Sequence, residues 1–348
     1  MKLTNKTKSF FLFIFILQTF ILFHSCVDKH SFAREELLSN IFRKKDITIA
    51  ITDSGLGGLS IAADLAERMR EAKIFRSVKI VFFNALFSNE GGYNSLSSRE
   101  MKIRIFDSSL HSLERKYTPN LILIGCNTLS VLFDDTSFAR QTQTPVAGIV
   151  DKGVDMIARS LKSTPESRVI IFATQTTIEE GIHKKRLVEK GFLDERVITQ
   201  SCPDLVTYIE KEYNSDETEM LIFAYVDEAL QKIPYPRTPL FVSFNCTHYG
   251  YSLSLWEKAF QSFNIKPLAF LNPNSRMIDF LFPPEKLARF KKTDISVHVV
   301  SMVEITKNKI KSIGEWLNKI SPQTAEALPH YELNPELFEW KSYLDKER

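Results

Sequence analysis

Two cysteines stand at matching points in the two halves of this sequence. Cys126 lies in "GCNTLS" directly after the apolar run "LILI", and Cys246 lies in "NCTHYG" directly after "PLFVSF". The chain has only four cysteines, so two of them at equivalent positions raise the question of a shared site. A cysteine becomes a useful base or nucleophile as its thiolate, which needs neighbouring groups that favour ionisation.

Other uses of these cysteines are open at this point. A free cysteine after a strand is often buried as a small hydrophobic residue, and we expect Cys202 in "SCPDLV" to serve packing only. A metal site would need further ligands near each cysteine, and no C-x-x-C occurs. A disulfide between Cys126 and Cys246 is conceivable if the protein is exported.

Polar residues follow both cysteines. Asn127, Thr128 and Thr247 would offer amide, hydroxyl and backbone N–H donors at the strand ends, where a carboxylate could bind.

A second polar motif, "DSGLGG" at 53–58, stands between a predicted strand and a predicted helix. A glycine-rich turn in this position can present backbone N–H groups to an anion. The segment does not fit the G-x-G-x-x-G dinucleotide fingerprint, and no P-loop occurs in the chain. Asp53 would lie at the strand end, where it could orient or activate a thiol or simply cap the helix.

Apolar runs alternate with stretches of helical spacing and supply the elements that must position these residues. This alternation, with continuous apolar strands, predicts an α/β fold with parallel sheets, whose ligand sites form at the carboxyl ends of strands. The predicted strands are 47–52, 78–83, 121–124, 146–150, 168–174, 196–199, 239–244, 266–271 and 295–300, with helices at 59–70 and 98–117.

The pattern of strand ends also repeats. Cys126 follows Asp53 by 73 positions, and Cys246 follows the strand-end residue Thr174 by 72. This register predicts two related, pseudo-symmetric α/β domains. If the two domains face each other, both cysteines reach a cleft between them from opposite sides.

Five short motifs resemble, in order, those of the cofactor-independent glutamate racemases in the Asp/Glu racemase superfamily. They are "DSGLGGLS", "GCNTLS", "ATQTTIEEG", "SCPDLV" and "NCTHY", and the similarity covers roughly residues 46–310. The resemblance implies two α/β domains with the active site in the cleft between them. It also implies that no pyridoxal phosphate, metal or other cofactor takes part.

The resemblance implies a role for each cysteine. Racemisation removes the Cα proton from one face of an amino acid and returns a proton to the other, so Cys126 and Cys246 would be the two acid/base residues. An ordinary thiol has a pKa near 8.5 and is mostly protonated at neutral pH, so each needs a helper. Asp53 on the Cys126 side and His248 on the Cys246 side match the assisting residues of the family.

Further positions match the residues that hold the substrate. By resemblance, the amino and carboxylate groups would be bound by Ser54, Asn127, Thr128, Thr176 and Thr247. The family's Pro-Tyr-Gly loop, which helps to bind the side-chain carboxylate, is present only loosely as "GGYN", with Tyr93 and Asn94. Asn84 stands near a usual Asp, and "NPN" (272–274) replaces an Asp-containing turn. These departures question glutamate as the substrate more than they question proton transfer.

The N-terminal segment differs from the rest of the chain. A basic start precedes the apolar stretch 10–23, which is shorter than the roughly 20 residues of a membrane-spanning helix and is typical of an export signal. Cys26 after "FHS" predicts a lipidation site, "SFA" at 31–33 is an alternative cleavage site, and an uncleaved anchor is a third possibility. Alternatively, the start codon is misassigned, and the protein is cytoplasmic with a fold that begins near Lys44.

Charge and composition narrow the classes of partner. The chain has 348 residues, 44% of them hydrophobic, which is typical of a folded protein large enough for two domains. Its formal charge is +3, and three lysines within the first eight residues account for the whole excess. A neutral body argues against nucleic-acid binding, and the membrane would be reached only through the N-terminal segment.

Together these features predict the following organisation. Residues 1–33 form the export signal or anchor, 34–45 a linker, 46–149 with 267–320 the first domain, 150–266 the second, and 321–348 a charged tail.

The leading hypothesis is an amino-acid racemase acting on glutamate. One alternative is a relative acting on aspartate or another small acid; the other is an anchored protein that binds an acidic amino acid without turning it over. D-glutamate for the cell wall is used in the cytoplasm, so an exported racemase would serve another purpose. A homodimer stays open.

Overall fold

The computed structural model describes residues 40–233 and 238–344. The predicted export signal, its cleavage sites and the lipidation site at Cys26 lie outside these residues, so all three remain predictions. Among the described residues, no helix is long and apolar enough to cross a membrane. Residues 46–348 form one compact unit, which carries all the elements considered below.

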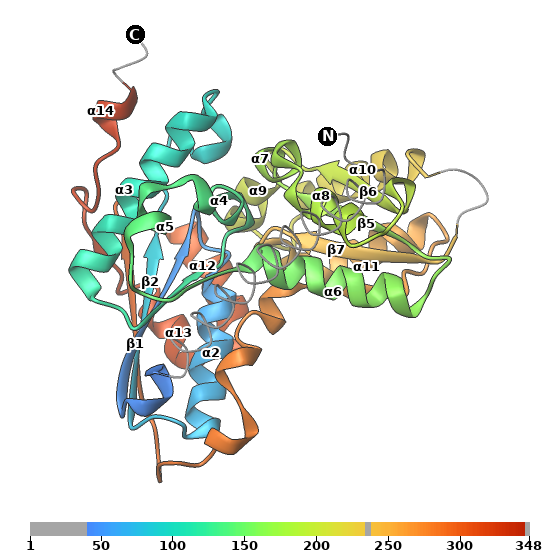
Figure 1. The fold of residues 1–348 in the computed structure, drawn as a ribbon. Coiled ribbons are helices and arrows are strands. Elements are labelled where there is room, and N and C mark those ends of the chain that lie inside the picture. The colour runs from blue at the N-terminus through green and yellow to red at the C-terminus, as the bar shows by residue number, and fades with distance from the viewer. Residues whose placement is uncertain (1–39, 234–237, 345–348) are drawn as a thin grey trace, which may run out of the picture. The chain divides into compact units, whose positions relative to one another are not determined.

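The first of two parallel sheets has six strands in the order β10-β9-β2-β1-β3-β4. Figure 1 labels β1 and β2 of this sheet. Its central strands are buried on both faces, which explains why they are continuous runs of Ile, Val, Leu and Phe. The strands are β1 (Asp46–Asp53), β2 (Ser77–Asn84), β3 (Leu121–Ile124), β4 (Val146–Gly148), β9 (Asp294–Ser301) and β10 (Glu332–Leu333).

The second sheet has four parallel strands in the order β6-β5-β7-β8. They are β5 (Arg168–Ala173), β6 (Val197–Ser201), β7 (Leu240–Asn245) and β8 (Ala269–Leu271). This order has the same pattern as β2-β1-β3-β4 of the first sheet, so β1 corresponds to β5 and β3 to β7. The α/β class with parallel sheets is confirmed, and the sheet order agrees with the repeat predicted from the spacing of strand ends.

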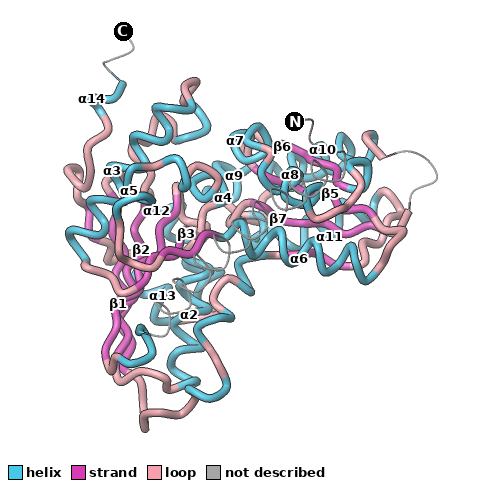
Figure 2. Tube along the Cα trace, viewed as in Figure 1, coloured by secondary structure: helices cyan, strands magenta, loops and turns pink. Residues whose placement is uncertain are grey.

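Helices flank both sheets and connect successive strands, as the cyan and magenta segments of Figure 2 show. They are α2 (Leu59–Ala72), α3 (Arg99–Tyr117), α4 (Asn127–Ser130), α5 (Ser137–Gln141), α6 (Ile149–Ser163), α7 (Gln175–Glu180), α8 (Ile182–Glu189), α9 (Leu205–Lys211), α10 (Asp216–Gln231), α11 (Leu253–Ser262), α12 (Lys307–Asn318), α13 (Pro322–Ala327) and α14 (Lys341–Leu344).

Helix α3 illustrates how local signals and core packing act together. Its N-cap, Ser98, accepts a hydrogen bond from the backbone N–H of Met101, and the helix ends where Thr118 adopts a left-handed conformation. Its apolar side chains, among them Ile105 and Phe106, pack with side chains of β1, β2 and β3 in one hydrophobic core cluster. This packing fixes the strands whose carboxyl ends carry the polar motifs.

Three segments differ in detail from the sequence-based expectation. The predicted strand 146–150 ends at Gly148, and Ile149 and Val150 begin α6, because an apolar run fits a buried helix start as well as a strand. β8 pairs with β7 of the second sheet, although 267–320 was predicted to belong to the first domain. Within the predicted tail, β10 pairs with β9 of the first sheet.

Candidate active site

A cavity of about 340 Å³ opens at the carboxyl ends of strands from both sheets. Ten of the residues predicted from the motifs line it: Asp53, Ser54, Tyr93, Asn94, Cys126, Asn127, Thr128, Cys246, Thr247 and His248. Half of them come from the first sheet's strand ends, and Cys246, Thr247 and His248 follow β7 of the second. The repeat therefore brings both cysteines to one site, as the spacing predicted.

Cys126 follows β3 and is buried. Its Sγ lies 3.1 Å from the hydroxyl oxygen of Ser54. Burial and the nearby charge of Asp53 raise the pKa of Cys126 to about 12, although the Ser54 hydrogen bond lowers it. At neutral pH the thiol form of Cys126 is therefore favoured over the thiolate.

Asp53 links the two halves of the site. Its Oδ2 accepts a hydrogen bond of 2.8 Å from the hydroxyl of Thr247, whereas its Oδ1 is buried and has no partner among the described residues. Burial raises the pKa of Asp53, while the charge of His248 and the Thr247 hydrogen bond lower it. The helper predicted for the Cys126 side therefore also touches the loop that carries Cys246.

Cys246 is buried beside His248. Its Sγ lies 3.7 Å from the imidazole Nδ1. Burial raises the pKa of Cys246 well above its ordinary value, and a backbone hydrogen bond at His248 opposes the rise. The arrangement resembles that on the other side: a desolvated thiol with one polar helper that can stabilise its ionised form.

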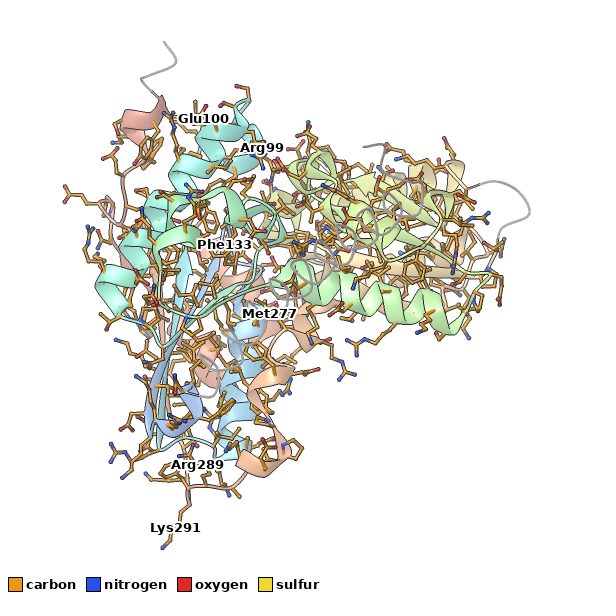
Figure 3. All side chains as sticks on the ribbon, viewed as in Figure 1. Arg99, Glu100, Phe133, Met277, Arg289 and Lys291 are labelled. Carbon is orange, nitrogen blue, oxygen red and sulfur yellow. The ribbon has the colours of Figure 1, made fainter. Side chains whose placement is uncertain are left out.

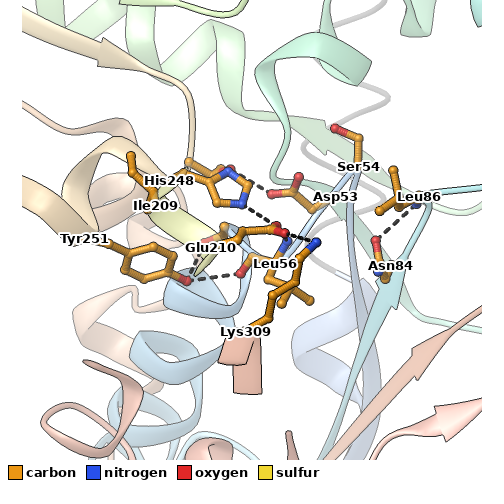
Figure 4. Close-up of polar contacts among 12 residues, drawn as sticks. Asp53, Ser54, Leu56, Asn84, Leu86, Ile209, Glu210, His248, Tyr251 and Lys309 are labelled. Atoms are coloured by element: carbon orange, nitrogen blue, oxygen red, sulfur yellow. Dashed lines mark hydrogen bonds and ion pairs between the residues drawn. The ribbon is translucent and has the colours of Figure 1, made fainter. Parts of the chain in front are cut away.

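Two further charged residues line the cavity that no motif predicted, Glu210 of α9 and Lys309 of α12. Figure 4 shows Glu210 between His248 and Lys309, 2.9 Å from His248 Nε2 and 2.7 Å from Lys309 Nζ. Its Oε1 also accepts the backbone N–H of Leu56 at 2.8 Å. Glutamate and lysine on helices read as ordinary surface residues, so nothing in the sequence marks this pair.

The residues predicted to hold the substrate divide into two groups. The amide of Asn127 is buried and neither of its polar atoms has a partner among the described residues, so it is free to bind a ligand. Thr128 instead bonds to Thr174 at 2.8 Å between hydroxyl oxygens, which ties the strand ends of the two sheets together.

Thr176 does not line the cavity. Its backbone N–H donates to Asn94 Oδ1 at 3.2 Å, and its hydroxyl accepts from the buried Lys102 at 2.9 Å. Thr176 therefore braces the loop that carries Asn94, rather than contacting the cavity itself.

The loop with Tyr93 and Asn94, which departs from the family pattern, also lines the cavity. Tyr93 is buried with its ring edge-to-face against Phe87, with centroids 5.2 Å apart, and Asn94 is held by Thr176. Asn84 does not line the cavity. Its side-chain amide donates to Ser301 Oγ, and its Oδ1 accepts the backbone N–H of Leu86, as Figure 4 shows. The Asn found near a usual Asp thus anchors the start of this loop.

The "NPN" segment also has a structural role. Asn274 donates from its amide to the backbone carbonyl of Thr247 and to the hydroxyl of Ser60, both at 2.9 Å. It therefore braces the Cys246 loop against α2.

Arg99, labelled in Figure 3, adds an exposed link from α3 to Glu180 of α7, with 2.8 Å between Nε and the carboxylate. Such exposed pairs contribute only about 0–1 kcal/mol.

Comparisons with known proteins find glutamate racemases of similar sequence. No family model matches the chain. "Glutamate racemase 3" of Caldanaerobacter subterraneus subsp. tengcongensis is 24% identical over 278 residues, which is 80% of this chain and 88% of the relative. "Glutamate racemase" of Campylobacter jejuni is 24% identical over 274 residues, 78% of this chain and 98% of the relative. In sequence, the chain is therefore similar to glutamate racemases over about four fifths of its length.

A solved structure of the superfamily has the same fold. The glutamate racemase of Francisella tularensis, solved in complex with D-glutamate, matches with a TM-score of 0.60 at 18% identity, over 79% of this chain and 95% of that one. In residues 40–233 and 238–344, no group of three or more His, Cys, Asp or Glu could hold a metal ion.

Proposed function

We propose that the chain is a cofactor-independent amino-acid racemase acting on glutamate or a closely related acidic amino acid. The observation that carries this proposal is the pair of buried thiols, Cys126 and Cys246, which reach one cavity from the ends of corresponding strands in two related sheets. A single thiol could be a packing residue, but two that face one cavity supply the opposed proton donor and acceptor that inversion requires.

The proposed reaction moves two protons. One cysteine, as thiolate, takes the proton from Cα, and the S–H proton of the other cysteine is delivered to the opposite face. The product leaves with inverted configuration, and the two cysteines have exchanged protonation states. The same pair therefore serves both directions, with Cys126 as the acceptor in one and Cys246 in the other.

The surrounding groups support each half of this cycle. Asp53 and Ser54 lie on the Cys126 side and His248 with Glu210 on the Cys246 side. The free amide of Asn127 and the polar strand ends offer donors to the substrate carboxylate. Donors held in place before the reaction stabilise the negative charge that develops at Cα and the carboxylate.

Glutamate is the first substrate to test because both relatives described above carry that name and a related structure holds D-glutamate. The loop with Tyr93 and Asn94, which departs from the family pattern, favours a second candidate, aspartate or another small acid. Binding without turnover is the third outcome, and the two cysteine variants separate it from catalysis.

The test uses the full chain under reducing conditions, incubated with L-glutamate in heavy water. NMR follows replacement of the Cα proton by deuterium, and chiral chromatography follows the D-isomer. Cys126→Ser and Cys246→Ser should each lower the rate at least about 100-fold, as expected when an acid/base residue is lost. Cys202→Ser is the matched control, because Cys202 is buried but does not line the cavity.

Racemisation that survives in either active-site variant would overturn the two-base mechanism. Absence of exchange with glutamate, aspartate and the other amino acids would overturn the racemase proposal. D-glutamate binding retained under those conditions would then point to the binding protein.

A further inference from the structure

We infer that Lys309 is a positioning residue for the Cys246 side of the site: it holds Glu210 in place against His248 and so fixes which imidazole nitrogen faces the thiol. The inference rests on the proposed function and deepens it. Lys309 comes from α12, beyond the last of the motifs, and none of the sequence patterns assigns it a role.

The contacts form a continuous chain from Lys309 to the thiol. Lys309 Nζ lies 2.7 Å from Glu210 Oε2, and Glu210 Oε1 lies 2.9 Å from His248 Nε2. His248 Nδ1 then lies 3.7 Å from Cys246 Sγ. With the Leu56 N–H also bound to Oε1, both carboxylate oxygens have partners. Glu210 therefore has little freedom to rotate away from the histidine.

This chain determines the proton arrangement on His248. Burial by itself would raise the pKa of Glu210, but the hydrogen bond and charge of His248 and the charge of Lys309 outweigh it and lower the pKa to about 2. Because the carboxylate has no proton to give, His248 Nε2 must be the donor in their hydrogen bond. In the neutral ring, Nδ1 then presents its lone pair to Cys246, so it can take the thiol proton.

Lys309 also balances the charge of the site. The titratable groups near Glu210 are Asp53 at the end of β1, His248 and Tyr251 of the turn after β7, and Lys309. Cys246 contacts the other ring nitrogen of His248. Among the described residues that line the cavity, Lys309 is the only lysine or arginine, so without it the two buried carboxylates would lie near a thiolate and an acidic substrate with no lysine or arginine to offset them. Like charges at such short range disfavour both the thiolate and the bound substrate.

The register between α12 and α9 is itself held by hydrogen bonds. The hydroxyl of Ser312, three residues after Lys309, donates to the carbonyl of Ile209, the residue before Glu210, at 3.4 Å. The same oxygen accepts the backbone N–H of Tyr213 at 3.2 Å. The two helices are thus fixed so that Lys309 meets Glu210, which favours a built arrangement over a chance surface ion pair.

The test compares Lys309→Met, Lys309→Arg and Lys311→Met in the full chain. Lys311 is exposed on the same helix and serves as the matched control. We expect Lys309→Met to lower kcat/KM for glutamate at pH 7 by at least about tenfold and to move the acid limb of its pH profile up by about one pH unit. Lys309→Arg should recover most of both, and Lys311→Met should match the wild type. Equal melting temperatures would show that folding is not the cause.

A second measurement does not depend on turnover. Iodoacetamide labelling of Cys246, followed by peptide mass over pH 6–10, reports its thiolate fraction. Lys309→Met should move this profile to higher pH, because removal of a cation disfavours the thiolate. Unchanged labelling, or an arginine variant as impaired as the methionine variant, would overturn the inference. If the wild type racemises no amino acid, the proposed function fails, and the labelling profile alone decides the role of Lys309.

Discussion

A methyl group added at Gly57 should disable the site, whereas one added at Gly314 should not. A Cβ atom at Gly57 would lie 2.3 Å from Thr247 Oγ1 and 2.7 Å from His248 Nδ1, both far inside contact distance. At Gly314, in the middle of α12, the same atom would have nothing within 4 Å. The two substitutions are chemically identical, so their difference isolates the closeness of the two loops.

The size of the effect follows from these contacts. Overpacking of a buried position costs about 1–3 kcal/mol, and disturbing the Thr247 hydrogen bond to the Asp53 carboxylate costs a similar amount. Gly57→Ala should therefore lower the melting temperature by about 5–10 °C. A displacement of His248 by about 1 Å should lower kcat/KM on the order of 100-fold. Gly314→Ala should instead stabilise the helix by up to about 1 kcal/mol.

The assay combines calorimetric melting with the racemisation rate, both measured for the two alanine variants in parallel. A Gly57→Ala protein with wild-type kcat/KM would refute the close approach of the "DSGLGG" and "NCTHYG" loops. Loss of activity in Gly314→Ala as well would show that the effect of alanine is not specific to the close approach at Gly57.

Three more predictions follow from the buried polar groups. The folded-state pKa of Glu210, about 2, lies below its ordinary 4.5. Ionised Glu210 therefore contributes about 3 kcal/mol to the free energy of unfolding above pH 4.5, and this contribution is lost as the pH falls towards 2. Between pH 7 and pH 3, urea unfolding should show a smaller loss of stability in Glu210→Gln than in the wild type. Cys126, with its pKa raised to about 12, should react with iodoacetamide at pH 8 about two to three orders of magnitude more slowly than free cysteine, and unfolding in urea should remove the difference. Thr176→Val should destabilise the protein by about 1–3 kcal/mol because Lys102 loses its acceptor, and adding Lys102→Met should restore part of that loss; denaturant midpoints that do not move would contradict this account.

The sequence predicted the thiols and polar residues that line the cavity better than the residues that support them. Strands are visible as apolar runs, and a strand's end places the next residue at the sheet's edge, so Asp53, Cys126 and Cys246 could be assigned to one site from order and spacing alone. The same logic fails for 146–150, because an apolar run does not say where a strand stops and a buried helix begins.

Glu210 and Lys309 could not be found in this way. They lie on different helices about 100 positions apart, and their meeting depends on how α9 and α12 pack, which is set by contacts such as that between Ser312 and Ile209. β10 is hidden for a related reason: only two residues of the C-terminal segment pair with β9, and that pairing is made by backbone groups that carry no sequence signature. Thr176 was predicted by motif position, which cannot distinguish a residue that contacts a ligand from one that holds the neighbouring loop.

The hydrogen bond between Asp53 and Thr247 couples the two halves of the cavity thermodynamically. Because it joins the strand end beside Cys126 to the strand end beside Cys246, a change on either side should alter the free energy of the other. Double-mutant cycles across the cavity should therefore be non-additive. The bond also contributes to the cohesion of the two sheets, so a molecule that occupies the cavity and bridges both loops should raise the melting temperature of the whole unit. Substitutions in the separate loop at Tyr93 would then change recognition of the substrate's side chain and leave the Asp53–Thr247 hydrogen bond in place.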